Sequence, residues 1–141
     1  MKIVLCSDHA GYSLKEQIKD WLKNNYDVLD AGAFSLDKND SYVDYAKQAN
    51  KMVVENNCYG IYVCGSGVGM SIVANRHKGL RAAVCYSKDI ALLSKQHNNI
   101  NVLCLGANFV SYEDAKQIIS AFLQTEFEGG RHQIRIENID K

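Results

Sequence analysis

A cysteine followed by three alternating glycines is the strongest chemical signal in this 141-residue chain. The segment reads Cys64-Gly65-Ser66-Gly67-Val68-Gly69-Met70-Ser71, between an apolar run and a predicted helix. Alternating glycines at such a place free backbone N–H groups to converge on an anion at the helix N-terminus. Met70 stands where a dinucleotide-binding fingerprint needs its third glycine, and no Gly-Lys-Ser/Thr follows as in a P-loop. The segment therefore predicts an anion or oxyanion cradle, with a tight packing turn as the alternative.

The thiol of Cys64 would face this helix N-terminus, which stabilises a thiolate and lowers the pKa of the thiol. Such a thiol can act as a nucleophile or as a general base, and the alternative is an inert buried cysteine. The odd number of cysteines, without close pairing, is typical of a reducing cytoplasm. No spacing is typical of a zinc site, so we expect no metal. The other four thiols are expected to be packing residues: Cys6, Cys58, Cys85 and Cys104.

Two histidines lie at the ends of predicted elements. Asp8-His9 follows the first apolar run, where the pair could be an acid and a base, phosphate ligands or a capped turn. His97, next to Asn98, closes a predicted helix. It could carry protons, although the helix dipole also favours an ordinary histidine there.

Two arginines in the C-terminal tail complete the set. Arg131 and Arg135 are four residues apart, so both guanidinium groups leave the same face of a helix. They could fork onto a phosphate, or they could belong to a solvated charged tail. With the cradle and the histidines they supply an anion clamp, a base and a proton carrier. This set suits proton transfer next to the carbonyl of a phosphorylated sugar.

The elements that must position these residues alternate between short apolar runs and longer segments of helical period. The runs lack polar alternation, as expected for strands covered on both faces. The predicted strands are Lys2–Cys6, Tyr26–Asp30, Gly60–Cys64, Leu80–Tyr86 and Val102–Leu105. The predicted helices are Ser13–Asn24, Tyr42–Asn56, Lys88–His97, Ser111–Gln124 and the tail Arg131–Lys141, with Ala31–Ser41 as an ordered loop. Ser13 and Glu16 have the spacing of a capping box at the first helix.

Strand–helix alternation repeated along the chain predicts an α/β fold. We expect one doubly wound, Rossmann-like domain over residues 1–141, with a five-stranded parallel sheet and a C-terminal helical tail. Ligands of such sheets bind at the carboxyl ends of the strands. We expect the site there, from the segments after the first, third and fifth strands, the last of which leads to Asn108, together with the helix end at His97.

Composition excludes several classes of partner. Sixteen basic and sixteen acidic side chains balance, which argues against nucleic acid and anionic membranes. No apolar run approaches the ~20 residues of a membrane span. The run Met1–Cys6 is too short for a signal peptide. We therefore expect a small-molecule ligand, no nucleic acid or membrane partner, and a cytoplasmic location.

Taken in order, the motifs resemble the type B ribose-5-phosphate isomerases, a family grouped with the galactose-6-phosphate isomerase subunits. Besides the glycine loop they are Asp8-His9-Ala10-Gly11, Ala74-Asn75, Arg81-Ala82, Ser94-Lys95-Gln96-His97-Asn98, Asn101-Val102-Leu103 and Glu128-Gly129-Gly130-Arg131-His132. The resemblance covers essentially the whole chain. It implies an aldose–ketose isomerase without metal or cofactor. Such an enzyme interconverts ribose 5-phosphate and ribulose 5-phosphate in the pentose phosphate pathway, through a cis-enediolate.

The resemblance also implies roles for individual residues. Cys64 would be the base, and the N–H groups of Gly65–Gly69 with the Ser66 hydroxyl would hold the enediolate oxygens. His97, assisted by Asp8, would open the sugar ring. The remaining implied contacts are those of His9, Arg131 and Arg135 with the phosphate and of Asn98 with the sugar. The site of this family lies between two subunits, which implies a homodimer or a tetramer.

The chain departs from the family pattern at three places. Ser66 stands where many relatives have threonine, and Ser41-Tyr42-Val43 stands where they have aspartate-tyrosine-proline. Asn108 replaces an arginine that contacts the phosphate, a loss of ~1.5–3 kcal/mol for one charge-assisted bond. A 6-phosphohexose such as allose or galactose 6-phosphate therefore stays open as the substrate. A noncatalytic module that binds a sugar phosphate is the second alternative.

Overall fold

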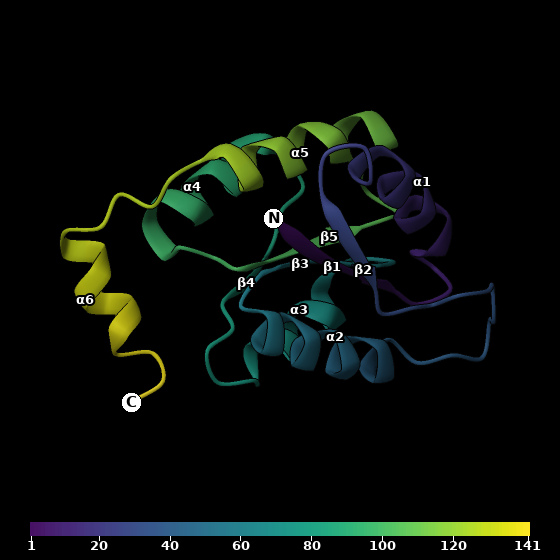
Figure 1. Ribbon diagram of the computed structural model, residues 1–141, viewed down its shortest axis with the longest axis horizontal. Helices are drawn as coiled ribbons and strands as arrows, with labels where there is room; N and C mark the ends of the chain where they lie inside the picture. Colours follow the sequence, from purple (N-terminus) through teal and green to yellow (C-terminus); the bar gives the residue numbers. More distant parts are fainter.

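Five parallel strands form one twisted sheet in the computed structural model, which describes residues 1–141 (Figure 1). The strands lie in the order β2-β1-β3-β5-β4. Their bounds are β1 Lys2–Ser7, β2 Asp27–Asp30, β3 Tyr59–Cys64, β4 Ala82–Val84 and β5 Val102–Gly106. The central strands β1, β3 and β5 are buried almost throughout, which explains why their sequences do not alternate between polar and apolar residues.

Helices cover both faces of this sheet, so the predicted doubly wound α/β fold is confirmed. The helices are α1 Tyr12–Leu22, α2 Tyr42–Asn56, α3 Val68–Asn75, α4 Lys88–Asn98, α5 Tyr112–Gln124 and α6 Arg131–Glu137. Figure 1 shows α1, α4 and α5 on one face and α2 and α3 on the other. None of these helices has both the length and the apolar character that crossing a membrane requires.

The two hydrophobic cores follow from the alternation of side chains along the strands. Ile3 and Leu5 of β1 pack with α1 and α5, whereas Val4 and Cys6 pack with α2 and α3. Cys6, Cys85 and Cys104 are buried in these cores, as expected, and burial raises the pKa of each thiol. The fourth expected packing thiol, Cys58, is half-buried.

The predicted capping box at the first helix is wrong. Helix α1 begins at Tyr12 with Gly11 as its N-cap, so Ser13 lies inside the helix. The turn before it is held by Asp8, whose Oδ1 accepts a hydrogen bond from the Gly11 N–H at 3.1 Å. Gly11 is required because a Cβ there would collide with the carbonyl of Val63. Tertiary contact with β3 therefore decides where the helix starts.

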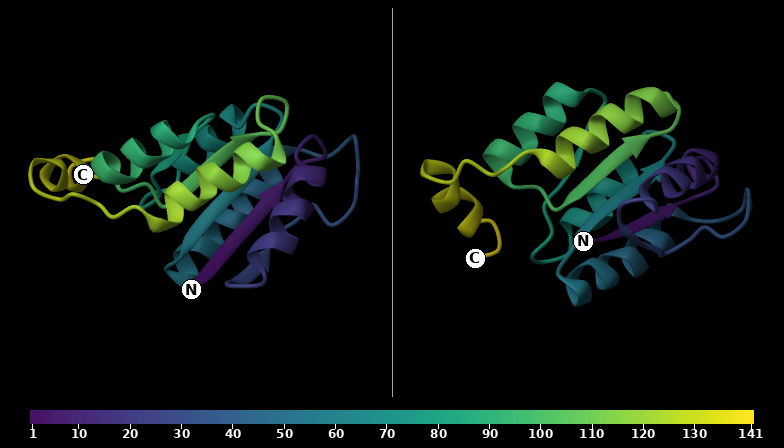
Figure 2. Two further views of the ribbon diagram at one scale, coloured as in Figure 1. Left: turned by 90° about the horizontal axis from the view of Figure 1, so that it is seen from above. Right: turned by 45° about the horizontal axis from the view of Figure 1, so that its top comes forward.

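Helix α6 stands at one end of the molecule (Figure 2). It lies near the end of α4, while the loop of residues 31–41 extends at the opposite end. The predicted helical tail is confirmed, but it is shorter than residues 131–141 because the helix ends at Glu137.

Candidate functional site

The glycine loop joins β3 to α3 at the carboxyl edge of the sheet. Gly67 is the N-cap of α3 and has a φ of 83°, in the left-handed region that favours glycine. A Cβ on Gly67 would lie 3.1 Å from the carbonyl carbon of Leu105, so the loop also packs closely on β5. The alternative of a tight packing turn is therefore observed, and the same loop forms the N-terminus of α3, where the anion cradle is predicted.

Cys64 ends β3 directly beneath this loop and is only 4% exposed. The N–H of Gly67 donates to its sulfur at 3.2 Å. The contact places the sulfur at the N-terminus of α3, where the predicted base is expected, while the burial of Cys64 also fits the alternative of a packing cysteine.

The glycine loop carries hydrogen-bond donors that the protein itself does not use. The N–H groups of Gly65, Ser66 and Gly69 donate to no group of the protein. The Ser66 hydroxyl oxygen accepts from the Val68 N–H at 3.1 Å, which leaves the hydroxyl hydrogen available. Three free N–H groups and one hydroxyl form a suitable cradle for an oxyanion.

Three aromatic residues support the loop. The hydroxyl of Tyr86 donates to the carbonyl of Ser66 at 2.7 Å, and Phe109 stacks on Tyr86 with ring centroids 5.2 Å apart. The ring of Tyr42 lies against Gly69 and leaves no room for a Cβ there. Only the position of Tyr86 at the end of a predicted strand could have indicated its place in the site.

Asp8 and His9 follow β1 at the same edge. Asp8 is buried and caps the α1 turn, so one of the three possibilities left open for the pair is observed. His9 pairs with Asp40 of the loop before α2, its Nδ1 lying 2.7 Å from Oδ1. This hydrogen bond is the main cause that raises the pKa of His9, with smaller contributions from the charges of Asp8 and Asp37. Nothing in the sequence pattern pointed to Asp40, because the loop brings it to His9 only in the fold.

Asn108 lies on the glycine loop from the β5 side. Its backbone N–H donates to the carbonyl of Gly65 at 3.0 Å. Its side-chain Nδ2 lies 3.1 Å from the position that a Cβ of Gly65 would take. The residue that replaces an expected arginine therefore borders the cradle, with a neutral amide in place of a charge.

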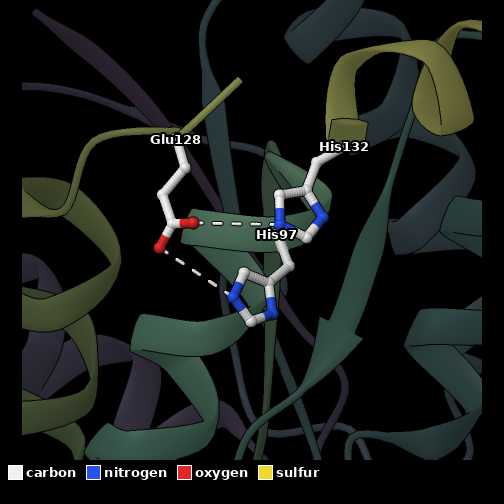
Figure 3. Close-up of side chains that lie close together, drawn as sticks. All are labelled: His97, Glu128 and His132. Atoms are coloured by element: carbon white, nitrogen blue, oxygen red, sulfur yellow. Dashed lines mark ion pairs between the residues drawn. The ribbon is translucent and has the colours of Figure 1, made fainter. Parts of the chain in front are cut away.

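A second cluster gathers around His97 at the end of α4 (Figure 3). The ring of His97 stacks on that of His132, with centroids 4.5 Å apart and an angle of 12° between the planes. Glu128 faces both rings: Oε1 is 3.9 Å from His97 Nε2, and Oε2 is 3.8 Å from His132 Nε2. Burial lowers the pKa of His132, and the charges of His97 and Arg131 act in the same direction.

The C-terminal arginines lie beside this second cluster, on α6. Arg131 and Arg135 are exposed, and neither has an ion-pair partner within the chain. Two adjacent glycines with positive φ, Gly129 and Gly130, turn the chain into the helix, and a Cβ on either would meet nothing. Backbone conformation alone therefore explains the glycine pair. Two unpaired guanidinium groups on one short helix can bind a phosphate by donating hydrogen bonds to its oxygens.

The two clusters lie at opposite edges of the sheet, which corrects one expectation. Cys64 ends a strand, whereas His97 and Asn98 end a helix that runs from the carboxyl end of β4 back to the amino end of β5. In a parallel sheet that helix end belongs to the amino edge. His97 therefore cannot share the carboxyl edge with the glycine loop of its own chain.

Neither cluster has the arrangement of a metal site, although each brings three potential ligands within 4.8 Å. The stacked rings of His97 and His132 direct their nitrogen lone pairs side by side rather than toward one point. At the other edge, Asp8 accepts from Gly11, and Asp40 is paired with His9. His9 Nδ1 and one oxygen of each carboxylate are already engaged within the protein, and we assign no metal or cofactor to these residues.

Comparison with known proteins gives consistent results along the whole chain. A family model described as Ribose/Galactose Isomerase matches residues 3–139. Ribose-5-phosphate isomerase B of Escherichia coli is 44% identical over 98% of this chain and 93% of its own length. A ribose 5-phosphate isomerase from Thermotoga maritima superposes with a TM-score of 0.95 at 44% identity, covering 99% of this chain and 97% of its own.

A third relative was solved with a sugar phosphate. Ribose-5-phosphate isomerase B of Mycoplasma genitalium, with bound ribulose-5-phosphate, has a TM-score of 0.94 and 42% identity. The match covers 98% of this chain and 93% of that one. The sequence matches and the structure matches all run along nearly the whole chain, and the chain belongs to the ribose/galactose isomerase family.

Proposed function

We propose that this chain interconverts ribose 5-phosphate and ribulose 5-phosphate, a reaction of the pentose phosphate pathway. The observation that carries the proposal is the Cys64 sulfur, which accepts a hydrogen bond from Gly67 beneath a loop of free N–H donors. The relatives named ribose-5-phosphate isomerase B, and the ribulose-5-phosphate bound in one of them, support this choice of substrate.

The isomerisation needs one base and a cradle for negative charge. The Cys64 thiolate removes the proton from C2 of the open-chain aldose, the C–H electron pair forms the C1=C2 double bond, and the carbonyl pair moves to O1. The cis-enediolate oxygens then accept hydrogen bonds from the N–H groups of Gly65, Ser66 and Gly69 and from the Ser66 hydroxyl. A proton then passes from O2 to O1, the O2 electron pair forms the new carbonyl at C2, and the electron pair of the C1=C2 bond takes the proton back from the thiol at C1, which gives the ketose. No redox partner is required.

Ring opening and phosphate binding need the residues of the second cluster. We place His97 as the acid/base that opens the ring, with Asp8 assisting, and Asn98 on the sugar hydroxyls. Arg131 and Arg135 bind the phosphate together with His9. His97, Asn98 and the two arginines of α6 lie at the opposite edge from Cys64 in one chain. These four residues therefore come from a partner subunit in a homodimer.

Exposed apolar side chains around the glycine loop support the dimer. Val68 and Ile72 share one face of α3, and Tyr86, Ile90 and Phe109 lie on neighbouring segments; all five are 46–64% exposed. Helix α3 is apolar on nearly all sides, which is unfavourable for a helix that faces water. Contiguous exposed apolar surface of this kind is typical of an interface.

The substitution Cys64→Ala tests the base. We expect kcat on ribose 5-phosphate to fall ~10²–10⁴-fold in a coupled assay, the usual contribution of a general base. Cys58→Ala is the matched control, because Cys58 precedes β3 at the other edge of the sheet. Wild-type turnover by purified Cys64→Ala protein would remove Cys64 from the mechanism.

One observation favours a second substrate class. Asn108 borders the cradle with a neutral amide, so the phosphate of a longer sugar could be held elsewhere. Comparing kcat/KM on ribose 5-phosphate with kcat/KM on allose and galactose 6-phosphates separates the two substrates. Calorimetry that finds tight binding of these sugars without turnover would instead indicate a noncatalytic module.

A further inference from the structure

His9 and Asp40 form a short, direct pair at the carboxyl edge. Oδ1 of Asp40 accepts two hydrogen bonds from the same residue, one from the backbone N–H of His9 at 3.1 Å and one from its ring Nδ1 at 2.7 Å. The backbone bond fixes where His9 stands, and the ring bond fixes how its imidazole is turned. Nε2 is left as the free ring nitrogen, on a side chain that is 37% exposed.

Asp40 itself is enclosed. Its side chain is only 5% exposed, and its second oxygen, Oδ2, is buried without a hydrogen-bond partner. A buried carboxylate is costly unless a positive charge compensates it. The imidazole of His9 is the group placed to supply that charge, so the geometry favours the protonated ring.

The tautomer explains why protonation matters for a phosphate. With Nδ1–H donating to Asp40, a neutral ring would turn the lone pair of Nε2 outward, and a phosphate oxygen would be repelled. In the protonated ring Nε2 also carries a hydrogen and a share of the positive charge. It can then donate a charge-assisted hydrogen bond to a phosphate oxygen.

We propose that Asp40 is a positioning residue for the substrate phosphate, because it holds His9 as an imidazolium that presents Nε2–H to a phosphate oxygen. The inference rests on the proposed function for the identity of the substrate. It adds a residue that no motif in the chain indicated. It also explains how the carboxyl edge can bind a phosphate with a neutral Asn108, because His9 is the cation among the predicted ligands at that edge.

The charges around His9 act in one direction. Asp40 is the main group that raises the pKa of His9, and the carboxylates of Asp8 and Asp37 add to it, whereas desolvation opposes it. Because the pKa is raised, the ring stays charged at pH values above the ordinary histidine pKa of ~6.5. The charge is lost as pH rises through the raised pKa. Phosphate affinity should therefore weaken on the alkaline side.

Inorganic phosphate is the probe, and Asp40→Asn is the variant. The dissociation constant of phosphate from the wild type and from the variant is measured by calorimetry between roughly pH 6 and pH 9. The pKa of His9 is measured by NMR in both ligand-free proteins. Without the carboxylate, about one-tenth of an ordinary imidazole remains charged one pH unit above its pKa. We expect phosphate to bind about tenfold more weakly near pH 7.5, and the alkaline limb of the curve to move to lower pH.

Two further variants keep the result interpretable. Asp37→Asn removes a nearby charge without the hydrogen bond, so it should move the pKa of His9 less than Asp40→Asn does. His9→Gln replaces the ring with a neutral N–H donor and should flatten the pH dependence. The inference is wrong if Asp40→Asn shifts neither the pKa of His9 nor the binding curve beyond the effect of Asp37→Asn. It is equally wrong if His9→Gln keeps the alkaline limb.

Neither measurement requires turnover, so the two proposals can fail separately. A chain that binds phosphate with this pH dependence but does not isomerise ribose 5-phosphate would contradict only the proposed function. An active isomerase whose phosphate affinity is indifferent to Asp40 would contradict only this inference.

Discussion

Asp30 holds two lysines at the end of β2, close to the loop that carries Asp40. Its oxygens accept from Lys15 Nζ at 2.9 and 3.0 Å, from Lys19 Nζ at 3.0 Å and from the Gly32 N–H at 2.9 Å. Burial alone would raise the pKa of Asp30, but these donors outweigh it and lower the pKa below its usual value. Lys15 is completely buried, and this carboxylate is its nearest anion, with Glu16 Oε2 farther away at 3.7 Å.

Asp30→Asn should therefore destabilise the fold at neutral pH. It leaves the buried ammonium of Lys15 without its nearest anion, which costs roughly 3 kcal/mol. Because the pKa of Asp30 is lower in the folded state, its stabilisation is present above the unfolded pKa of ~3.9 and is lost as pH falls through the folded value. The free-energy difference from wild type should shrink toward acid pH in urea titrations.

The matched control is Asp20→Asn. Asp20 is 72% exposed and pairs only with Lys23, so its loss should change the free energy of unfolding by less than ~1 kcal/mol. An Asp30→Asn effect as small as that of the control would contradict the buried network.

Helix α6 packs on the rest of the chain through very few side chains and carries two exposed arginines. The helix spans seven residues, and His132 is its one buried side chain. The stack of His132 on His97 joins α6 to the end of α4. This leaves Arg131 and Arg135 exposed and unpaired, in a position to meet an anion on another molecule.

Arg131→Ala and Arg135→Ala should each raise KM for ribose 5-phosphate more than they lower kcat. The phosphate is held equally in the ground and transition states. Loss of one arginine contact therefore weakens the binding of both states by the same amount. Each lost charge-assisted bond corresponds to a rise in KM of roughly 10- to 100-fold. Steady-state kinetics would test this, with Lys51→Ala on the exposed face of α2 as the charge-matched control. An unchanged KM in both arginine variants would exclude the phosphate clamp.

Elements were predictable wherever local pattern alone decides them. Buried strands and amphipathic helices have their period in the sequence, so the sheet and its helices were expected with nearly correct bounds. The start of α1 was not, because contact of Gly11 with Val63 outweighs the local spacing of Ser13 and Glu16. The pairing of Asp40 with His9 was equally invisible, since it joins positions 31 residues apart through a loop.

At the scale of the whole molecule, the direction of the chain through the sheet decides which residues can meet. Sequence motifs predicted Cys64 and His97 as site residues, but they assigned both to one edge. Each helix returns the chain to the amino edge, so a residue that ends a helix lies opposite a residue that ends a strand. The correct placement requires the topology, and it makes one chain an incomplete version of the proposed site.

A complementation experiment tests this division between subunits. Cys64→Ala and His97→Gln chains should each be nearly inactive alone, because each lacks one half of every site. In a co-refolded equal mixture, half of the dimers carry both chains, and each mixed dimer has one site with Cys64 and His97 intact. Activity should therefore recover to about a quarter of the wild-type value. A mixture of Cys64→Ala with Cys64→Ser chains is the control and should recover nothing. If Cys64 and His97 acted within a single chain, every site of a mixed dimer would lack one of them, and mixing would restore no activity.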